Sequence, residues 1–300
     1  MSGKIEVLDG GMSRLLESIG APFKLPEWSA LSLIEAPEYV TQAHQLYAQS
    51  GANILTTNTY GLVPHMLGQA RFDSQAKILA SRAGALAREV ADNYDNVRVA
   101  GSIPPLFPSY RPELYRPELA ETILAPLISG LLPYIDFWLI ETQSSIGESL
   151  DTLAQIRRYS ALPVYISYTL KDEEGRSEPA ELRSGESISA AVDSALSAGV
   201  AAILFNCSQP EVMSDAIRKT VAIIAHSDSR DVRVGVYANA FMPEPVSDIP
   251  YAGISLLRPD MDPPNYLKWV EKWEADGALI IGGCCGIGPE HIAAIRQWVD

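Results

Sequence analysis

The chain has 300 residues, of which 47% are hydrophobic and 20% are charged, an ordinary composition for a globular enzyme. Its formal net charge of −14 argues against a nucleic-acid partner, because such proteins present a basic face to phosphates. The first residues lack the apolar core of a signal peptide, and no apolar run approaches the length of a membrane span. We therefore expect a cytoplasmic protein with small-molecule partners, no membrane and no need of disulfides, and the oligomeric state stays open.

Short apolar runs rich in β-branched residues recur along the chain, each about as long as a strand. Most of them lack strict alternation of apolar and polar residues, as expected of strands that are buried on both faces. The predicted strands are 5–8, 53–57, 97–100, 137–140, 164–168, 201–205, 232–237 and 278–281.

A helical stretch follows within the segment after each of these runs. The predicted helices are 38–50, 74–92, 117–132, 148–159, 186–198, 210–225, 264–276 and 289–299. Gly51 and Gly199 fit C-terminal helix caps. Four prolines fit first helical turns, where the missing N–H breaks no helical hydrogen bond. They are Pro117, Pro210, Pro264 and Pro289.

Eight strands alternating with eight helices predict one (β/α)8 barrel domain over residues 1–300. A doubly wound open sheet is the alternative. It would need a glycine-rich phosphate turn after the first strand, and Asp9-Gly10-Gly11-Met12 does not match that turn. Two proline-rich stretches, 103–117 and 242–264, are predicted to be long loops after strands, and such loops often carry function.

The three cysteines of the sequence, Cys207, Cys284 and Cys285, follow the sixth and eighth predicted strands. In a barrel, catalytic groups come from the C-terminal ends of the strands, so the cysteines would share one rim. Three thiolates form a soft site suited to Zn²⁺, and they leave a fourth tetrahedral position open, as catalytic zinc sites do. Buried thiols or a redox disulfide are the alternative interpretations.

Polar residues also end other predicted strands. Asp9 and Glu141 could bind an ammonium group or act as acid and base, or they could be a helix cap and a solvated loop carboxylate. Glu141 follows an apolar run, so we expect it to be partly buried and to need a partner. Thr57 and Asn58 taken alone are more often structural than catalytic. The histidines are expected to be structural, on helical or loop surfaces (His44, His65 and His226) or in the first turn of the last helix (His291).

Five short motifs together resemble those of the homocysteine S-methyltransferase family. They are Leu8-Asp9-Gly10-Gly11, Thr57-Asn58-Thr59-Tyr60, Ile140-Glu141-Thr142, Phe205-Asn206-Cys207-Ser208 and Gly282-Gly283-Cys284-Cys285-Gly286. The likeness covers nearly the whole chain, and its two cysteine motifs are the most specific part. It implies a (β/α)8 barrel that holds zinc on the three cysteines.

The resemblance also implies that Asp9, Gly10, Asn58 and Glu141 help hold the amino-acid end of homocysteine, and the residues themselves suggest further contacts. The residues expected to hold homocysteine are Asp9, Gly10, Thr57, Asn58, Glu141 and Asn206. The residues expected on the side of the methyl donor are Tyr60, Phe107, Tyr110 and Tyr237. Phe107 and Tyr110 belong to the loop 103–115, whose aromatic faces would attract a sulfonium as they attract other cations.

The function implied is transfer of a methyl group from S-methylmethionine or S-adenosylmethionine to the thiol of homocysteine, which gives methionine. Members of the family differ in donor, and a sulfonium is favoured because the sequence shows no folate or cobalamin module. Two loops depart from the usual pattern of the family, at 101–107 and at Tyr237-Ala238-Asn239. A different donor or acceptor, or a non-catalytic zinc-binding or thiol-sensing barrel, therefore stays an alternative.

Overall fold

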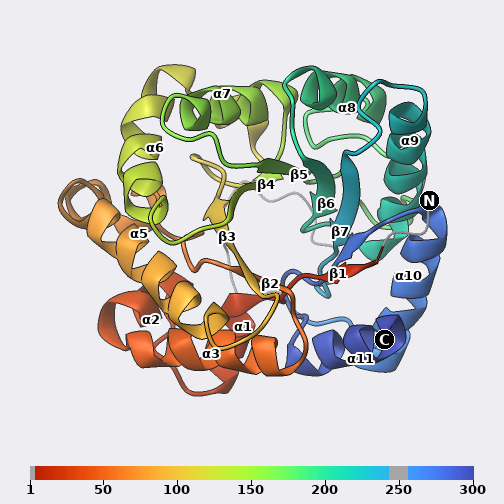
Figure 1. Cartoon of the computed structure of the whole chain (residues 1–300). Helices are drawn as coiled ribbons and strands as arrows, with labels where there is room; N and C mark the ends of the chain where they lie inside the picture. The colour runs from red at the N-terminus through yellow and green to blue at the C-terminus, as the bar shows by residue number, and fades with distance from the viewer. Residues whose placement is uncertain (1–3, 243–255) are drawn as a thin grey trace.

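The computed structural model describes residues 4–242 and 256–300. Within them, one sheet of eight parallel strands runs in the order β1-β8-β7-β6-β5-β4-β3-β2. A parallel bridge between Leu8 and Ile54 joins the two ends of this order and closes the barrel (Figure 1). The strands are β1 (Glu6–Val7), β2 (Ile54–Thr56), β3 (Arg98–Ile103), β4 (Phe137–Gln143), β5 (Val164–Tyr168), β6 (Ala202–Asn206), β7 (Arg233–Tyr237) and β8 (Ile280–Ile281).

Helices form an outer ring around this barrel (Figure 1). The eight predicted ones are α3 (Pro37–Gln49), α5 (Gln69–Ala91), α6 (Pro117–Leu131), α7 (Ile146–Arg157), α8 (Ile188–Ser197), α9 (Met213–Ala225), α10 (Pro263–Asp276) and α11 (Pro289–Val299). Gly51 and Gly199 follow the ends of α3 and α8 with φ of +93° and +71°, as the predicted caps require. The (β/α)8 barrel is therefore confirmed.

Three further helices were not predicted: α1 (Met12–Ser18), α2 (Ser29–Glu35) and α4 (Pro64–Leu67). They have 7, 7 and 4 residues, so none is long enough to repeat an apolar period that sequence reasoning can detect. Two 3₁₀ turns, η1 (Pro112–Leu114) and η2 (Pro210–Val212), complete the described elements. The second one takes the residues predicted as the first turn of α9.

Two strands are longer than predicted. β3 ends at Ile103 rather than at residue 100, and β4 ends at Gln143 rather than at residue 140. Glu141 therefore lies inside β4 and not after it. The end of the apolar run is a poor guide to the end of β4, because the polar residues that follow it are buried as well. Glu141, for example, accepts a hydrogen bond from Ser102 of β3.

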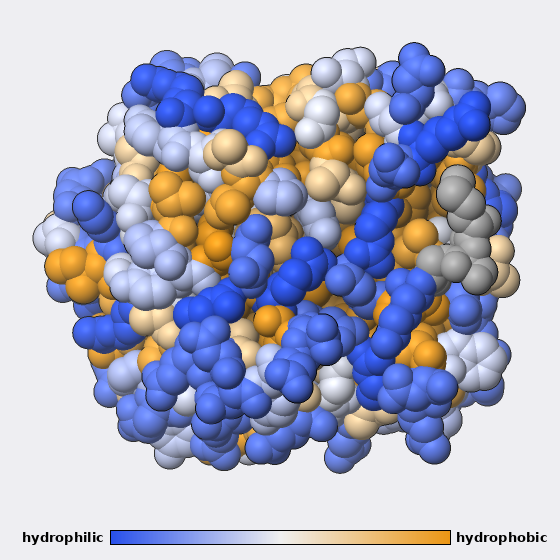
Figure 2. Space-filling view, viewed as in Figure 1, coloured by the Kyte–Doolittle hydropathy of each residue, from blue (hydrophilic) through white to orange (hydrophobic). Residues whose placement is uncertain are grey.

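A charged layer fills the N-terminal end of the barrel. Glu6, Arg98 and Arg233 begin or nearly begin β1, β3 and β7, and both arginines pair with the Glu6 carboxylate. Arg98 also reaches the hydroxyl of Tyr165 on β5, at 3.5 Å. Alternate strands thus supply one layer of four side chains, as barrels of this kind do. Figure 2 shows hydrophilic side chains gathered across the middle of one face.

In the two described ranges, no helix is long and apolar enough to cross a membrane. The predicted loop 103–117 lies between β3 and α6, as expected. The predicted loop 242–264 falls largely on residues 243–255, which lie outside the described residues. Its described borders meet in an antiparallel bridge between Phe241 and Leu257, so both sides of the loop start from the same place on the barrel rim.

Candidate functional site

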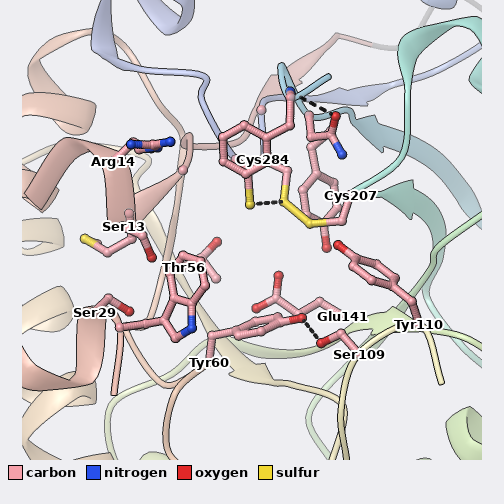
Figure 3. A pocket seen from close by; sticks show the side chains of 18 of the residues that line it. Ser13, Arg14, Ser29, Thr56, Tyr60, Ser109, Tyr110, Glu141, Cys207 and Cys284 are labelled. Carbon is pink, nitrogen blue, oxygen red and sulfur yellow. Dashed lines mark hydrogen bonds between the residues drawn. A yellow bond between two sulfur atoms is a disulfide. The ribbon is translucent and has the colours of Figure 1, made fainter. Parts of the chain in front are cut away.

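A cavity of about 790 Å³ opens among the loops that follow the C-terminal ends of the strands (Figure 3). Its volume is that of an ordinary small-molecule site, and its position is the catalytic end of a (β/α)8 barrel. Most of the predicted site residues line it. These are Asp9, Gly10, Thr57, Asn58, Tyr60, Tyr110, Glu141, Cys207, Tyr237, Cys284 and Cys285.

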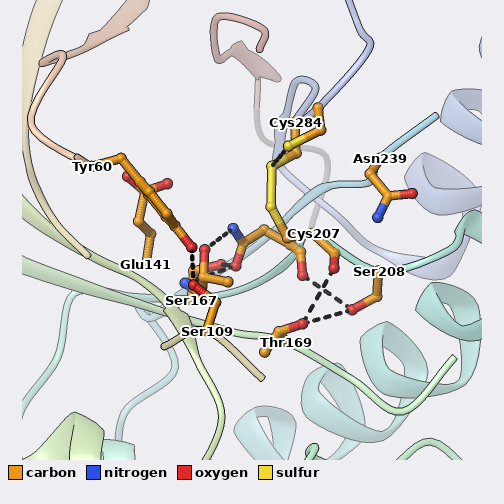
Figure 4. The surroundings of a disulfide bond; sticks show 12 residues. Tyr60, Ser109, Glu141, Ser167, Thr169, Cys207, Ser208, Asn239 and Cys284 are labelled. Carbon is orange, nitrogen blue, oxygen red and sulfur yellow. Dashed lines mark hydrogen bonds between the residues drawn. A yellow bond between two sulfur atoms is a disulfide. The ribbon is translucent and has the colours of Figure 1, made fainter. Parts of the chain in front are cut away.

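The three cysteines meet at the wall of this cavity. Their sulfur atoms all lie within 4.8 Å of one another. The structure joins Cys207 and Cys284 in a disulfide, with their Cα atoms 5.7 Å apart, and the Sγ of Cys285 is 3.9 Å from that of Cys284 (Figure 4). The sequence left a redox disulfide open as the alternative to a metal site, and the structure pairs two of the three cysteines in this way. The physical reason is proximity, since three sulfur atoms that share one point include a pair within bonding reach.

A tight turn explains how two adjacent cysteines face one cavity. The N–H of Ile287 donates to the carbonyl of Cys284 at 3.1 Å, which closes a turn of four residues. Gly286, its third residue, has φ of +82°, a conformation that L side chains rarely adopt. Cys207 itself has φ of +48°, and strained backbone of this kind is common at functional sites.

The thiol of Cys285 is held in its protonated form. Burial, with the neighbouring charge of Glu141, raises its pKa to about 11, although Arg14 acts in the opposite direction. Near neutral pH, Cys285 is therefore a thiol unless a cation shares the site.

Asp9 lies just after β1 and is 3% exposed. Its carboxylate accepts hydrogen bonds from the backbone N–H of Thr56, at 2.7 Å, and from the Thr56 hydroxyl, at 2.8 Å. Burial nevertheless raises the pKa of Asp9 to about 8; the two bonds from Thr56 oppose the rise, and the charge of Glu141 adds to it. The Gly10-Gly11 segment offers less than expected to a ligand, because the Gly11 N–H already donates to Ile287.

Glu141 enters the cavity from β4 and is 8% exposed. Its carboxylate accepts a hydrogen bond from the hydroxyl of Ser102, and burial raises the pKa of its carboxyl to about 7. The sequence predicted a partly buried Glu141 with a partner, and the structure shows a buried Glu141 that is bonded to Ser102. Two carboxyl groups that titrate near neutrality form one end of the cavity, where an incoming cation would favour their ionised forms.

The other predicted acceptor residues differ in placement. Asn58 lines the cavity and donates its amide to the Ser29 carbonyl, at 3.0 Å. Thr57 accepts from the Ser102 N–H, also at 3.0 Å. Asn206 does not line the cavity: it is fully buried, and its amide bonds Thr142 at 2.8 and 3.0 Å.

The predicted donor residues are only partly brought together. Tyr60 lines the cavity, with its hydroxyl 2.7 Å from that of Ser109 (Figure 3). Tyr237 is buried beside the carboxyl groups, and burial and the Glu141 charge raise its pKa well above the ordinary value. Phe107 is not in the lining and packs edge-on against Tyr115, with ring centroids 5.8 Å apart.

Tyr110 lines the cavity, but one face of its ring is taken. The guanidinium carbon of Arg183 lies 4.6 Å from the ring centroid, and Arg183 pairs with Asp172 at 2.6 Å. A sulfonium ion would be repelled from that face by the arginine. The place of Tyr110 on the donor side therefore stays a prediction, and only the other face of its ring would be open to a sulfonium.

Several lining residues were missed by sequence reasoning. Arg14 of α1 (Figure 3) lies over the ring of Phe241, at 5.5 Å. Trp28 comes from the segment between α1 and α2. Gln209, another lining residue, donates its side-chain amide to that of Asn239, at 3.1 Å. No sequence signal points to most of them. Only the place of Arg14, one turn after the Gly10-Gly11 segment, could have suggested it.

The surface placement predicted for His44 is wrong. It is fully buried in α3, and neither ring nitrogen has a hydrogen-bond partner in the described residues. The ring nitrogens of His65 are likewise inaccessible to solvent. His226 is exposed and His291 stands in the first turn of α11, as predicted. None of the four histidines is among the described residues of the cavity wall.

The fold and the site together define a class of protein, a (β/α)8 barrel whose catalytic end joins three cysteines to two buried carboxyl groups. The chain belongs to the homocysteine S-methyltransferase family, whose model matches residues 6–299, and it is an enzyme of that family. This agrees with the resemblance noted in the motifs.

Individual relatives align over nearly their whole length. The homocysteine S-methyltransferase of Escherichia coli is 27% identical over 312 residues, which cover 97% of this chain and 94% of that protein. Homocysteine S-methyltransferase 1 of Brassica oleracea var. italica is 27% identical, with 98% and 93% covered. The crystal structure of the Escherichia coli homocysteine methyltransferase MmuM in its metallated form is 25% identical, has a TM-score of 0.79, and covers 99% of this chain and 97% of its own.

Proposed function

We propose that this enzyme binds zinc through Cys207, Cys284 and Cys285 and transfers a methyl group from a small sulfonium donor to the thiol of homocysteine. The observation that carries the proposal is the group of three sulfur atoms within 4.8 Å of one another, at the wall of a cavity that also holds two carboxyl groups. The solved relative in a metallated form supports a metal in this family.

The sulfur atoms fit a zinc ion in chemistry and in spacing. Zinc bonds thiolate sulfur at about 2.3 Å, so two sulfur ligands of a tetrahedral ion lie roughly 3.8 Å apart. The Sγ atoms of Cys284 and Cys285 are 3.9 Å apart. Cys207 and Cys284 must both leave the disulfide, because a disulfide sulfur carries no thiolate charge. Reduction must therefore precede metal binding.

The carboxyl groups fit the amino-acid end of homocysteine. Asp9 and Glu141 would take its ammonium group, and Gly10, Thr57 and Asn58 would border its carboxylate end. The amide of Asn206 would not touch homocysteine; it would act indirectly, by holding Thr142 beside Glu141 near the end of β4. Pairing with an ammonium ion lowers the pKa of both carboxyl groups from their raised values, so the substrate favours the charged state that binds it.

For this reaction the protein would need only to activate the homocysteine thiol and to position the thiol and the methyl donor. Zinc, when bound, would keep the homocysteine sulfur as a thiolate, whereas a free thiol with a pKa of about 8.5 is mostly protonated near neutrality. The carbon–sulfur bond to homocysteine forms as the bond to the donor sulfur breaks, and the donor departs as a neutral sulfide. No general acid is required, in keeping with a cavity wall that has no histidine among its described residues.

The donor end of the cavity favours a cation. The rings of Tyr60 and Tyr237 also line the cavity, and aromatic rings attract a cation. A sulfonium meets these conditions and loses its methyl group readily. Betaine is the competing cation, and its tertiary-amine product is a poorer leaving group.

The test measures methionine formation after reduction of the protein with a phosphine and loading with zinc. Initial rates are compared for S-methylmethionine, S-adenosylmethionine, betaine and methyltetrahydrofolate. We expect a sulfonium to be the best donor, a chelator to abolish activity, and added zinc to restore it. Unreduced protein should take up no zinc at the site.

The matched variant is Cys285→Ser, which removes the free thiol and leaves the Cys207–Cys284 pair intact. We expect it to lose both zinc and activity while it stays folded. Full activity in this variant or after chelation would contradict the zinc assignment. Preference for betaine or methyltetrahydrofolate would contradict the sulfonium donor.

A further inference from the structure

Tyr47 lies outside the cavity, yet its hydroxyl touches the backbone of two loops that build the site. It belongs to α3, in the outer ring, and it is completely buried. The hydroxyl oxygen is 3.0 Å from the carbonyl of Gly11 and 3.2 Å from the carbonyl of Ile287. Gly11 stands two residues after Asp9, and Ile287 stands two residues after Cys285.

These two loops are tied to each other at the same place. The Gly11 N–H donates to the Ile287 carbonyl at 2.9 Å, and the Gly283 N–H donates to the Asp9 carbonyl at 3.0 Å. The Ile287 carbonyl therefore accepts from both Gly11 and Tyr47. The loop with the carboxyl group and the loop with the paired cysteines form one unit, with the tyrosine hydroxyl at its centre.

The residues around the hydroxyl pack closely against it. A Cβ added at Gly10 would lie 2.8 Å from the Cε1 atom of Tyr47 and 2.9 Å from its hydroxyl oxygen. Such a Cβ would lie nearer still to the Ile287 carbonyl oxygen, at 2.3 Å, so a side chain at position 10 is excluded by the Ile287 carbonyl and by Tyr47 together. This contact gives a physical reason for the first glycine of the Asp9-Gly10-Gly11 motif that is independent of any substrate.

The link to the cysteines runs through the turn described above. Its last residue, Ile287, donates its N–H to Cys284 and offers its carbonyl to Tyr47. A shift of this residue would open the turn and move both sulfur atoms. The hydroxyl is suited to a permanent bond, because burial and the charges of Asp9 and Cys285 raise the pKa of Tyr47 well above its ordinary value. It stays a neutral donor.

We propose that Tyr47 is a positioning residue, which sets the spacing of Cys284 and Cys285 relative to Cys207 and to Asp9 through the Gly11 and Ile287 carbonyls. Its importance for the metal rests on the function proposed above. Groups that orient metal ligands from behind commonly change metal affinity by 10–100-fold when they are removed. Tyr47 would orient the backbone turn that carries two of the metal ligands, Cys284 and Cys285.

The experiment compares Tyr47→Phe with Tyr168→Phe. Both tyrosines are completely buried and both variants lose one hydroxyl, but that of Tyr168 lies 3.0 Å from Ser149 on α7 and, among the described residues, bonds neither the Asp9 loop nor the turn that carries Cys284 and Cys285. Zinc affinity is measured on reduced protein by competition with a chromophoric chelator. We expect it to fall by roughly 10–100-fold in Tyr47→Phe and to stay within about twofold of the unmodified protein in Tyr168→Phe.

A second readout needs no metal. The equilibrium constant for forming the Cys207–Cys284 disulfide against glutathione depends on how the two sulfur atoms are held. We expect it to change by several-fold in Tyr47→Phe and not in Tyr168→Phe. Unchanged zinc affinity together with an unchanged disulfide equilibrium would overturn the inference.

The two readouts separate this inference from the proposed function. If the unmodified protein binds no zinc but Tyr47→Phe alone shifts the disulfide equilibrium, the zinc proposal fails and the positioning role stands. Should Tyr47→Phe not fold, Gly10→Ala serves instead, because its new Cβ pushes against the same hydroxyl and the same Ile287 carbonyl. If neither folds while Tyr168→Phe does, Tyr47 is only structural and the inference is refuted.

Discussion

At the scale of single residues, the carboxyl groups of Asp9 and Glu141 govern how the cavity responds to charge. Both are nearly inaccessible to solvent, and burial raises their pKa values to about 8 and about 7. Burying a carboxyl group costs free energy, and hydrogen bonds offset part of that cost: Thr56 donates to Asp9 and Ser102 donates to Glu141. An ammonium group placed between them would recover part of the lost hydration energy.

This arrangement predicts a selective defect in Glu141→Gln. The variant keeps the shape but loses a charge-assisted hydrogen bond worth roughly 1.5–3 kcal/mol, so KM for homocysteine should rise about 10–150-fold. KM for the methyl donor should change less. In the unmodified enzyme, KM for homocysteine should rise as the pH falls below about 7, because the carboxylate is then protonated.

Glu148→Gln is the matched control for steady-state kinetics. Glu148 is another buried carboxyl group, with its pKa raised by burial to about 7, but it accepts a hydrogen bond from the Ser144 N–H just before α7 and does not line the cavity. Its variant should affect stability more than KM. If Glu141→Gln and Glu148→Gln gave the same KM for homocysteine, the assignment of Glu141 to the acceptor would fail.

At the scale of elements, the strands supply the frame and short turns supply the chemistry. β8 has only two residues, and the cysteine pair follows it within a turn closed by Ile287. The position of both sulfur atoms therefore depends on one left-handed residue, Gly286. A Cβ there would also lie 3.1 Å from that of Ala240, with the side chain of Leu257 nearer still.

Gly286→Ala should consequently weaken zinc binding as well as stability. A non-glycine residue at positive φ costs of order 1–3 kcal/mol, and the contacts with Ala240 and Leu257 add to it. The control is Gly20→Ala, at a φ of +83° that nearly equals the +82° of Gly286, but with no atom within 4 Å of the added Cβ. Urea unfolding should show a loss in both variants, and chelator competition should show weaker zinc binding only in Gly286→Ala. Equal zinc affinities would argue against the role of the turn.

At the scale of the whole molecule, the buried histidine of α3 couples stability to pH. His44 is completely buried without a hydrogen-bond partner in the described residues, and burial lowers its pKa from 6.5 to about 4. The unfolded chain takes up a proton near pH 6.5, whereas the folded protein resists until about pH 4. The stability present above pH 6.5 is thus lost as the pH falls toward 4.

We predict that His44 contributes about 3 kcal/mol to this loss at pH 4, from a pKa difference of 2.5 units at 1.36 kcal/mol per unit. Denaturant unfolding at several pH values measures it. His44→Gln cannot be protonated, so its unfolding free energy should fall less between pH 6.5 and 4. The exposed His226→Gln should behave like the unmodified protein. Parallel pH profiles for all three proteins would refute the prediction.

The sequence by itself determined the (β/α)8 fold, the family, and the common rim of Cys207, Cys284 and Cys285. Buried parallel strands and first-turn prolines are local signals, and residues after strands must share one end of a barrel. Tertiary structure decided the rest. Glu141 lies inside β4 because Ser102 satisfies it, Tyr110 is covered by Arg183, and Phe107 turns to Tyr115. His44 is buried, and Tyr47 reaches Ile287, 240 residues away along the chain. These outcomes depend on contacts between distant segments, which no local pattern of residues encodes.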